Sequence, residues 1–479
     1  MNFLLTTSFI VLTSIYLYGQ DGTLDDAFIP ENVLNSSVIC SAIQEDGKIL
    51  VGGWFDNSLG SGLNRIARFN SDGSLDNTFI TGSGFNSLSG DLTAPTVRSI
   101  SIQEDGKIIV GGGFSTYNND STQSITRLNS DGSLDETFQN KSVFGTVHAT
   151  AIQNDGKIIV GGNFLDTINS KRNHITRLNS DGSVDETFTP IIGFDTKPDN
   201  VMSITLQLDG KIIIGGNFSE YDGVSRNKIV RLNSNGSIDT SFNPGTGFNS
   251  IVYSTALQED GKILVGGRFF IFNGIVTNYI TRLNSDGSID ESFNVGVNIG
   301  FDKRVNCIKI QSDNKIIVGG SFSEYSGEDI EAVARLNVDG TLDKAFDSGA
   351  KWDVSVRSIS FQSDGRIIIA GEFYHFNLDG VVRNRIARLN TNILSVHDEN
   401  LENLIHVFPN PTSDKAELQI PNKLKGGKLV ISNAKGQIID QSEMKESSKV
   451  IDFENHDKGI YFIRINTQKG IITRRVVKQ

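Results

Sequence analysis

The chain has 479 residues, of which 37% are hydrophobic and 21% charged, so it is long enough for about three domains and apolar enough to bury a core. This composition excludes wholesale disorder. Residues 391–479 hold 13 Lys and Arg against 11 Asp and Glu, a balance of +2; because the whole chain carries −12, residues 1–390 carry −14. Such an acidic body repels phosphate backbones and anionic lipid headgroups, which argues against nucleic acid and membrane surfaces as partners.

The first residues predict a secretory signal peptide. Residues 3–18 form an apolar run that is too short and too early for a comfortable membrane span, so we expect residues 1–19 to be a signal peptide cleaved after Gly19. A membrane anchor is the alternative, because no Lys or Arg precedes the run and Leu17 stands where a small residue is usual. No later stretch is apolar enough, so no membrane span is expected in the mature chain.

A motif of the form Q-x-D-G-K-I-I-V-G-G recurs seven times, at intervals of 50 to 59 residues. Its copies begin at Gln44, Gln103, Gln153, Gln207, Gln258, Gln311 and Gln362. A second motif, R-L-N-S-D-G-S-L-D-E-T-F, follows each copy, and its arginines are Arg68, Arg127, Arg177, Arg231, Arg282, Arg335 and Arg388. Similarity at a fixed period of this length indicates an array of supersecondary units.

Each repeat predicts four short antiparallel strands. In the second repeat these are Val97–Gln103, Lys107–Gly112, Ile125–Asn129 and Ser133–Phe138, the last being the weakest. Asp-Gly closes the first turn and Ser-Asp-Gly the third, where a positive φ is needed. The Gly-Gly pair that ends the second strand suggests close approach of another backbone. Its second position is the stricter, because the seventh repeat has Ala370-Gly371.

The two ends of the repeat array complete one another. The seventh repeat stops after Asn390, and Asp21–Phe28 supplies the missing end of the second motif. This predicts an all-β, seven-bladed β-propeller at residues 20–390, closed by its N-terminal strand, since an open solenoid would need caps instead. The Arg and Asp of the second motif are expected to form an ion pair in each repeat, which is Asp25 with Arg388 in the divided one.

Both motifs resemble those of the delta-60 repeat family over residues 20–390. The resemblance implies a bacterial β-propeller of a kind common in secreted proteins.

The only cysteines, Cys40 and Cys307, occupy a position that Ser or Ala fills in the other repeats. We therefore expect small buried thiols and no disulfide, although export would permit one.

A polar linker at residues 391–403 precedes a C-terminal module at residues 404–479. Its predicted strands are Ala416–Ile420, Lys428–Ser432, Gln437–Asp440, Val450–Phe453, Ile460–Ile465 and Ile471–Val477. Short strands of this kind predict a small antiparallel β-sandwich. The entry around Pro409 and Pro411 is too rich in proline for a central strand.

This module resembles the type A C-terminal sorting domain of the type IX secretion system of Bacteroidota. The resemblance rests on Pro409, Asn410, Pro411, Gly436, Gly459 and Tyr461, and on a basic final strand with Arg474, Arg475 and Lys478. It implies contact with the type IX export machinery and passage through the periplasm and the outer membrane. It also implies cleavage, followed by attachment to the cell surface or release.

Candidate ligand contacts lie where the repeats differ. In an antiparallel blade the short, constant turns lie at one end and the connections of variable length at the other, and function on repeat folds sits where repeats differ. One position in the constant block also varies, the residue after Gly-Gly: Trp54, Gly113, Asn163, Asn217, Arg268, Ser321 and Glu372. Of these, Trp54, Asn163, Asn217, Arg268 and Glu372 are candidate ligand contacts, and tolerance of an exposed position is the alternative.

Two recurring patterns have a structural explanation as their first interpretation. The loop around Asp131 resembles a calcium loop but lacks the EF-hand spacing, so we expect a hairpin turn and no cofactor, with calcium as the alternative. Aromatic residues recur after the second strand and before the first: Tyr117, Tyr221, Phe272, Tyr325 and Phe376, and Phe85, Phe194, Phe248, Phe301 and Trp352. We expect them to pack within blades, with a sugar-stacking platform as the alternative.

No catalytic constellation is recognised in the sequence. The six histidines lack metal-ligand spacing, and nucleophile-elbow and phosphate-loop motifs are missing. The acids that depart from the repeat pattern are Asp166, Asp222, Glu324, Asp353 and Glu372.

The sequence favours a secreted or surface-displayed binding or adhesion module with an unknown glycan or protein ligand. An exported polysaccharide hydrolase or lyase is the alternative, which a close pair of these acids would favour.

Overall fold

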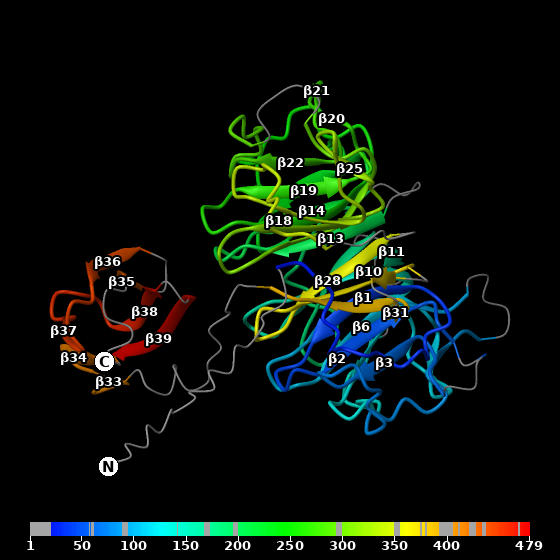
Figure 1. Cartoon of the computed structure of the whole chain (residues 1–479), viewed down its shortest axis with the longest axis horizontal. Coiled ribbons are helices and arrows are strands. Elements are labelled where there is room, and N and C mark those ends of the chain that lie inside the picture. Colours follow the sequence, from blue (N-terminus) through cyan, green and yellow to red (C-terminus); the bar gives the residue numbers. More distant parts are fainter. Residues whose placement is uncertain are drawn as a thin grey trace, which may run out of the picture.

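The computed structural model describes residues 21–56, 58, 62–88, 94–140, 142–166, 173–194, 200–293, 299–348, 355–373, 376–378, 381–391, 406–410, 412–420, 428–433, 437–467 and 470–479. The predicted signal peptide and all but one residue of the predicted linker lie outside these residues. The described residues form strands and turns (Figure 1), and none of them belongs to a helix long and apolar enough to cross a membrane.

Each repeat forms an antiparallel sheet of three strands. The first strands are β1 (Val38–Ile43), β5 (Thr96–Ile102), β10 (Val143–Ile152), β13 (Asn200–Leu206), β18 (Val252–Leu257), β23 (Val305–Ile310) and β28 (Val356–Phe361). The second strands are β2 (Ile49–Gly53), β6 (Ile108–Gly113), β11 (Ile158–Asp166), β14 (Ile212–Asn217), β19 (Ile263–Gly267), β24 (Ile316–Gly320) and β29 (Ile367–Gly371). The third strands are β3 (Ile66–Phe69), β9 (Ile125–Leu128), β12 (Ile175–Leu178), β17 (Ile229–Leu232), β22 (Ile280–Leu283), β27 (Val333–Leu336) and β32 (Ile386–Leu389).

Short outer strands accompany these sheets. They are β4 (Phe85–Asn86), β7 (Thr116–Tyr117), β8 (Asp120–Ser121), β15 (Glu220–Tyr221), β16 (Val224–Ser225), β20 (Ile271–Phe272), β21 (Ile275–Val276), β25 (Glu324–Tyr325), β26 (Glu328–Asp329), β30 (Phe376–Leu378) and β31 (Val381–Arg383). The aromatic pairs predicted from the sequence lie here: Phe85 packs on Tyr117 with ring centroids 4.6 Å apart, and both side chains are fully buried. The equivalent pairs in repeats four to six are buried too, which supports blade packing. Trp352 and the side chain of Phe376 lie outside what is described.

The first strands of the repeats contact one another in a complete circuit. β1 contacts β5, the contacts continue through β10, β13, β18 and β23 to β28, and β28 contacts β1. The N-terminal segment lies beside β32: Leu24 forms an antiparallel bridge with Leu389, and the Asp25 amide donates to the Arg388 carbonyl at 2.8 Å. Repeats one and seven are therefore neighbours around a common axis.

The predicted fourth strand is wrong in its length. In the second repeat only one bridge joins it to β9, between Leu128 and Leu134. The chain then turns, because Asp135 Oδ1 accepts hydrogen bonds from the amide of Thr137 (3.0 Å) and from its hydroxyl (2.6 Å). Gln139 next donates its amide to the Asp181 carbonyl, in the third turn of the following repeat. The segment therefore links repeats instead of lengthening a sheet.

The Gly-Gly pair has two different neighbours. A Cβ on Gly53 would lie 2.1 Å from the carbonyl oxygen of Ser37, in the backbone of the same hairpin, whereas a Cβ on Gly52 would meet the side chain of Val97 in the next repeat. A side chain can move and a paired backbone cannot, which explains why the first position accepts Ala370 and the second remains glycine.

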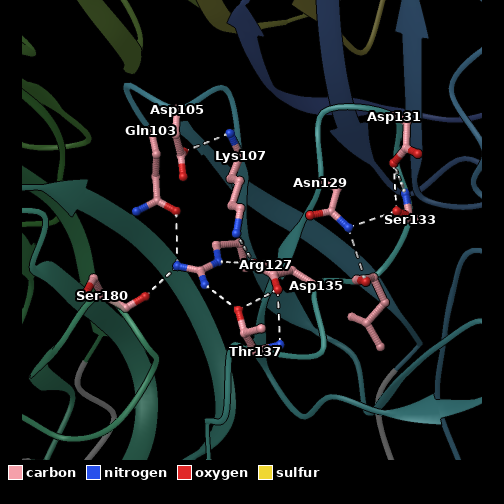
Figure 2. Close-up of polar contacts among 11 residues, drawn as sticks. Gln103, Asp105, Lys107, Arg127, Asn129, Asp131, Ser133, Asp135, Thr137 and Ser180 are labelled. Atoms are coloured by element: carbon pink, nitrogen blue, oxygen red, sulfur yellow. Dashed lines mark hydrogen bonds and ion pairs between the residues drawn. The ribbon is translucent and has the colours of Figure 1, made fainter.

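An arginine holds each repeat to the next (Figure 2). In the second repeat Arg127 Nε donates to Asp135 Oδ2 at 2.6 Å, Nη2 donates to Thr137 Oγ1 at 3.0 Å, and Nη1 donates to the Ser180 carbonyl of the third repeat. Lys107 also donates to Asp135 Oδ2, at 2.8 Å, and the guanidinium lies 5.2 Å from the Phe138 ring centroid. We call this arrangement the arginine clamp.

The arginine clamp recurs around the ring. The Arg Nε to Asp Oδ2 distances are 2.7 Å for Arg68–Asp76, 2.6 Å for Arg177–Asp185, 2.6 Å for Arg231–Asp239, 2.6 Å for Arg282–Asp290, 2.7 Å for Arg335–Asp343 and 2.8 Å for Arg388–Asp25. Arg388 also donates to the Ser71 carbonyl of the first repeat. Arg335 instead reaches the carboxylate of Asp21. The N-terminal segment therefore supplies clamp partners to the last two repeats.

The C-terminal module consists of two antiparallel sheets. One has the order β33 (His406–Phe408), β34 (Lys415–Gln419), β37 (Ser448–Asp452), and the other β36 (Ile438–Glu443), β35 (Lys428–Asn433), β38 (Gly459–Thr467), β39 (Gly470–Lys478). Both sheets contribute side chains to one buried cluster that includes Leu418, Ile431 and Ile463. The Pro-rich entry contains β33, a short strand at a sheet edge, where proline is tolerated.

The arginine clamp predicts how stability depends on pH. Burial raises the pKa of the Asp135 carboxyl, but hydrogen bonds from Lys107, Thr137 and Arg127 outweigh it, so that this pKa lies well below its usual value. Asp76, Asp185, Asp239 and Asp290 are shifted in the same direction. A depressed folded-state pKa contributes stability above the unfolded-state pKa of about 4, and that contribution is lost as the pH falls through the folded value.

We therefore expect the free energy of unfolding to be fully developed at neutral pH and to fall steadily below about pH 4. Asp135→Asn should lower it by about 3–5 kcal/mol at neutral pH, because Arg127 is left buried without its counter-charge, and should make the acid dependence shallower. Urea unfolding across a pH series measures both effects, with the exposed Glu104→Gln as control. Equal acid dependence in Asp135→Asn and the wild type would contradict this account.

Candidate functional site

The predicted variable positions lie together at one end of the inner hairpins. Gly113, Asn163 and Asn217 still belong to the second strands β6, β11 and β14. Trp54, Arg268 and Glu372 directly follow theirs, and their amides donate to the carbonyls of Ser37 (2.9 Å), Ile251 (2.8 Å) and Ser355 (2.9 Å), each just before the first strand. The constant turns lie at the other end of the strands, beside the arginine clamps. Figure 2 shows the clamp of the second repeat with its two constant turns. We call the first end the variable end.

A second set of variable residues was missed in the sequence. In every repeat the register of the first two strands shifts by one residue near the variable end, which is a β-bulge. The bulged residues are Ile39, Arg98, His148, Met202, Tyr253, Asn306 and Arg357, all half-buried on the innermost strands. The sequence signal for this set was the position between a constant Val and a small residue, where the seven repeats carry six different residue types and only Arg occurs twice.

Two of these bulged residues form a cationic cluster with predicted site residues. Arg98 lies over the Trp54 ring, 5.5 Å from its centroid, and Arg357 Nη2 forms an ion pair with Glu372 at 2.6 Å. Burial and the charge of Arg357 lower the pKa of Arg98. Arg98 and Arg357 both lie at bulges of first strands, β5 and β28, which flank β1 in the inner circuit of the ring.

His148 lies next to this cluster. Burial is the largest cause that lowers its pKa to about 3, the positive charge of Arg98 adds to it, and a hydrogen bond with Asn200 opposes it. The imidazole is therefore neutral at physiological pH. It offers hydrogen bonding without adding a third positive charge to the cationic cluster.

A pocket of 620 Å³ opens at the variable end between the fifth and sixth repeats. Its lining residues are Asn249, Ser250, Arg268, Phe270, Tyr279, Lys303, Arg304 and Ser321. Arg304 Nε donates to Ser321 Oγ at 3.0 Å, and Ser321 contacts Ser355 Oγ at 2.9 Å. Asn306 donates to the same Ser355 hydroxyl at 2.7 Å, so a hydrogen-bond chain connects the pocket to the ring of bulged residues.

The candidate residues thus divide into groups. Trp54 and Glu372 belong to the cationic cluster, and Arg268 belongs to the pocket. Asn163 is exposed at its equivalent position, and Asn217 is paired in register with Asn200. Neither asparagine is among the residues that line the described pocket.

The other polar candidates have local structural partners. Asp131 Oδ1 accepts the amide of Ser133 at 2.9 Å and its hydroxyl at 2.7 Å, which closes the turn where calcium was the alternative (Figure 2). Asp222 Oδ1 accepts the amides of Ile192 and Gly193, both at 2.8 Å. Asp353 and the side chain of Asp166 lie outside what is described.

The two cysteines are free. Burial raises the pKa of Cys40 and of Cys307 to about 12, so both thiols stay protonated and unreactive.

The residues of the sorting motif lie along the last strand. Asn410 Oδ1 accepts the Val477 amide at 2.9 Å, and Thr412 forms a parallel bridge with Lys478. The buried Lys478 ammonium donates to the carbonyls of Phe453 and, at 2.6 Å, of His456. Pro409 is exposed, Gly459 has a φ of 155°, and the Tyr461 hydroxyl donates to the Asp457 carbonyl at 2.6 Å. Pro411 and Gly436 lie outside the described residues.

Comparison with known families agrees with both modules. The chain belongs to the family described as a domain of unknown function (DUF5122) β-propeller, which matches residues 44–79, 103–138, 153–188, 207–242, 258–293, 311–346 and 362–392, together just over half of the chain. The family described as a secretion system C-terminal sorting domain matches residues 406–479. The sorting domain indicates interaction with the type IX export machinery and export to the cell surface or secretion.

More distant likenesses are weak. Beta-agarase A of Zobellia galactanivorans is 22% identical over 199 residues, which are 40% of this chain and 32% of that protein, so the chain spans about a third of the curated relative it matches. The surface component PorZ of the type IX secretion system of Porphyromonas gingivalis gives a TM-score of 0.40 at 12% identity, over 92% of this chain and 59% of that one. A catalytically inactive virginiamycin B lyase from Staphylococcus aureus gives 0.39 at 16%, over 76% and 97%. Neither structural likeness bears on function.

The cationic cluster predicts how the neighbouring His148 titrates. His148 should remain neutral down to about pH 3. Replacing Arg98 by Gln removes the second cause of the low pKa but leaves burial, so the His148 pKa should rise and still stay below 6.5. Titration of the imidazole protons by NMR measures this, and His148→Gln assigns the signal. The same titration in Arg98→Gln and the wild type would show that the two side chains do not interact.

Proposed function

We propose that this exported β-propeller is a binding module that recognises an extracellular ligand with its variable end. The supporting observation is the division between its two ends. The constant end repeats the arginine–aspartate ion pair of the clamp in all seven repeats. The variable end carries unlike side chains at two equivalent positions per repeat and contains the pocket between repeats five and six. Recognition of a ligand requires different side chains at equivalent positions, whereas a repeat array with a purely structural role does not require them.

The distribution of the unpatterned acids supports binding over hydrolysis. A glycoside hydrolase needs two carboxyl groups within about 5 to 10 Å of each other. Among the described residues, Asp222, Glu324 and Glu372 belong to three different repeats. Asp222 holds two backbone amides, and Glu372 is paired with Arg357. Two of these three carboxylates therefore already have partners within the protein, which favours a binding role over a catalytic pair.

The test is a screen of glycans and extracellular proteins against residues 20–479, run with and without a chelator, followed by affinity measurements on any ligand found. Arg268→Ala or Glu372→Ala should weaken binding about tenfold or more, because a hydrogen bond to a charged group contributes about 1.5–3 kcal/mol. Glu104→Ala, exposed in a turn at the constant end, is the matched control. Unchanged affinity of both variants would reject the variable end as the binding surface.

A further inference from the structure

The pocket between repeats five and six departs in charge from the domain that contains it. Residues 1–390 carry −14, yet the lining includes Arg268, Lys303 and Arg304 and no carboxylate. The nearest acid along the chain is Asp302, whose Oδ2 lies 3.6 Å from Lys303 Nζ. Asp302 also accepts the amide and hydroxyl of Ser323, so it is occupied by the protein and only partly offsets Lys303.

The two arginines keep donors available for a ligand. Arg304 uses Nε to bond Ser321, which fixes the plane of its guanidinium. Among the described residues neither terminal nitrogen of Arg304, and no nitrogen of the exposed Arg268 guanidinium, has a hydrogen bond or ion pair within the protein. Paired guanidinium nitrogens match the two oxygens of a carboxylate or sulfate in a bidentate arrangement.

An aromatic surface lies beside these cations. The Phe270 side chain is 49% exposed, which is unusual for phenylalanine in this ring. Asn249 Oδ1 accepts the amides of Phe270 and Ile271, both at 3.1 Å, and so holds this segment in place. Tyr279 adds a second ring, and Ser250 and Asn249 add neutral hydrogen-bonding groups. Aromatic faces, hydroxyls and an amide are suited to the apolar face and hydroxyls of a sugar ring.

We propose that this pocket binds an acidic saccharide, with Arg268 and Arg304 holding a carboxylate or sulfate group and Phe270 packing against the sugar ring. The inference rests on the proposed binding function and names its ligand class. The domain as a whole is acidic, but charges beyond the Debye length of about 8 Å are screened at physiological salt. An anionic ligand in the pocket therefore interacts mainly with the local cations. An extended acidic peptide could bind the same cations but would pack less well than a sugar ring against the exposed Phe270 side chain.

The experiment measures affinity of residues 20–479 for polygalacturonate and dextran sulfate, with neutral dextran and poly-glutamate as comparison probes. Arg268→Gln and Phe270→Ala are the test variants, because both side chains are exposed and neither change should alter the thermal unfolding midpoint. Lys344→Gln, which removes an equal charge from an exposed side chain that forms an ion pair with Glu328, is the matched control. Each measurement is repeated at raised salt.

We expect binding to at least one acidic polysaccharide, weakened about tenfold in Arg268→Gln and several-fold in Phe270→Ala, reduced by salt and unchanged in Lys344→Gln. Equal binding by Arg268→Gln and the wild type would overturn the proposal, as would binding to poly-glutamate alone, to dextran alone, or to none of these probes. A ligand from the wider screen that requires Glu372 but not Arg268 would leave the binding function standing and refute only this pocket.

Discussion

The arginine clamp is the interaction on which the architecture depends. Each repeat is a small three-stranded sheet, and the chain leaves the fourth strand after a single bridge. One guanidinium then joins its own carboxylate, its own aromatic ring and a carbonyl of the next repeat, as Arg127 does with Asp135, Phe138 and Ser180. Buried ion pairs stabilise little relative to apolar packing, but they fix geometry, because a displaced partner would leave a buried charge unpaired. Six such contacts, together with the ion pair of Arg335 and Asp21, hold neighbouring sheets at a fixed angle.

The same constraint gives the N-terminal segment its role. Asp25 is the carboxylate partner of Arg388 among the residues that the structure describes, and Phe28 lies under the same guanidinium, 4.9 Å from it. Asp21 meets Arg335 of the preceding repeat. With the constant end held by repeated contacts, the opposite end can vary in sequence at little cost to stability. This separation explains how Trp54, Arg268 and Glu372 can occupy equivalent positions in one ring.

Much of this arrangement could be predicted from the sequence, because it depends on residue types and spacings within each repeat. Turn residues, the repeat period and the complementary ends determine the strands, and the pairing of Arg388 with Asp25 follows from counting positions. The missed features depend on contacts through space. Lys107 as a third member of the clamp, the bulge at Arg98 and the short fourth strand require knowledge of register. The pocket requires Arg268 from one repeat and Arg304 from the next to meet, and no spacing along the chain reveals that.

The central claim is that Asp21–Phe28 docks beside β32 and completes the ring. Hydrogen exchange of the mature chain, followed by mass spectrometry of peptides from this segment, tests it most directly. The amides of Gly22 and Asp25 donate to backbone carbonyls of the last repeat, so the account predicts exchange as slow as that of the third strands in the other repeats. Exchange as fast as that of an exposed turn would contradict it.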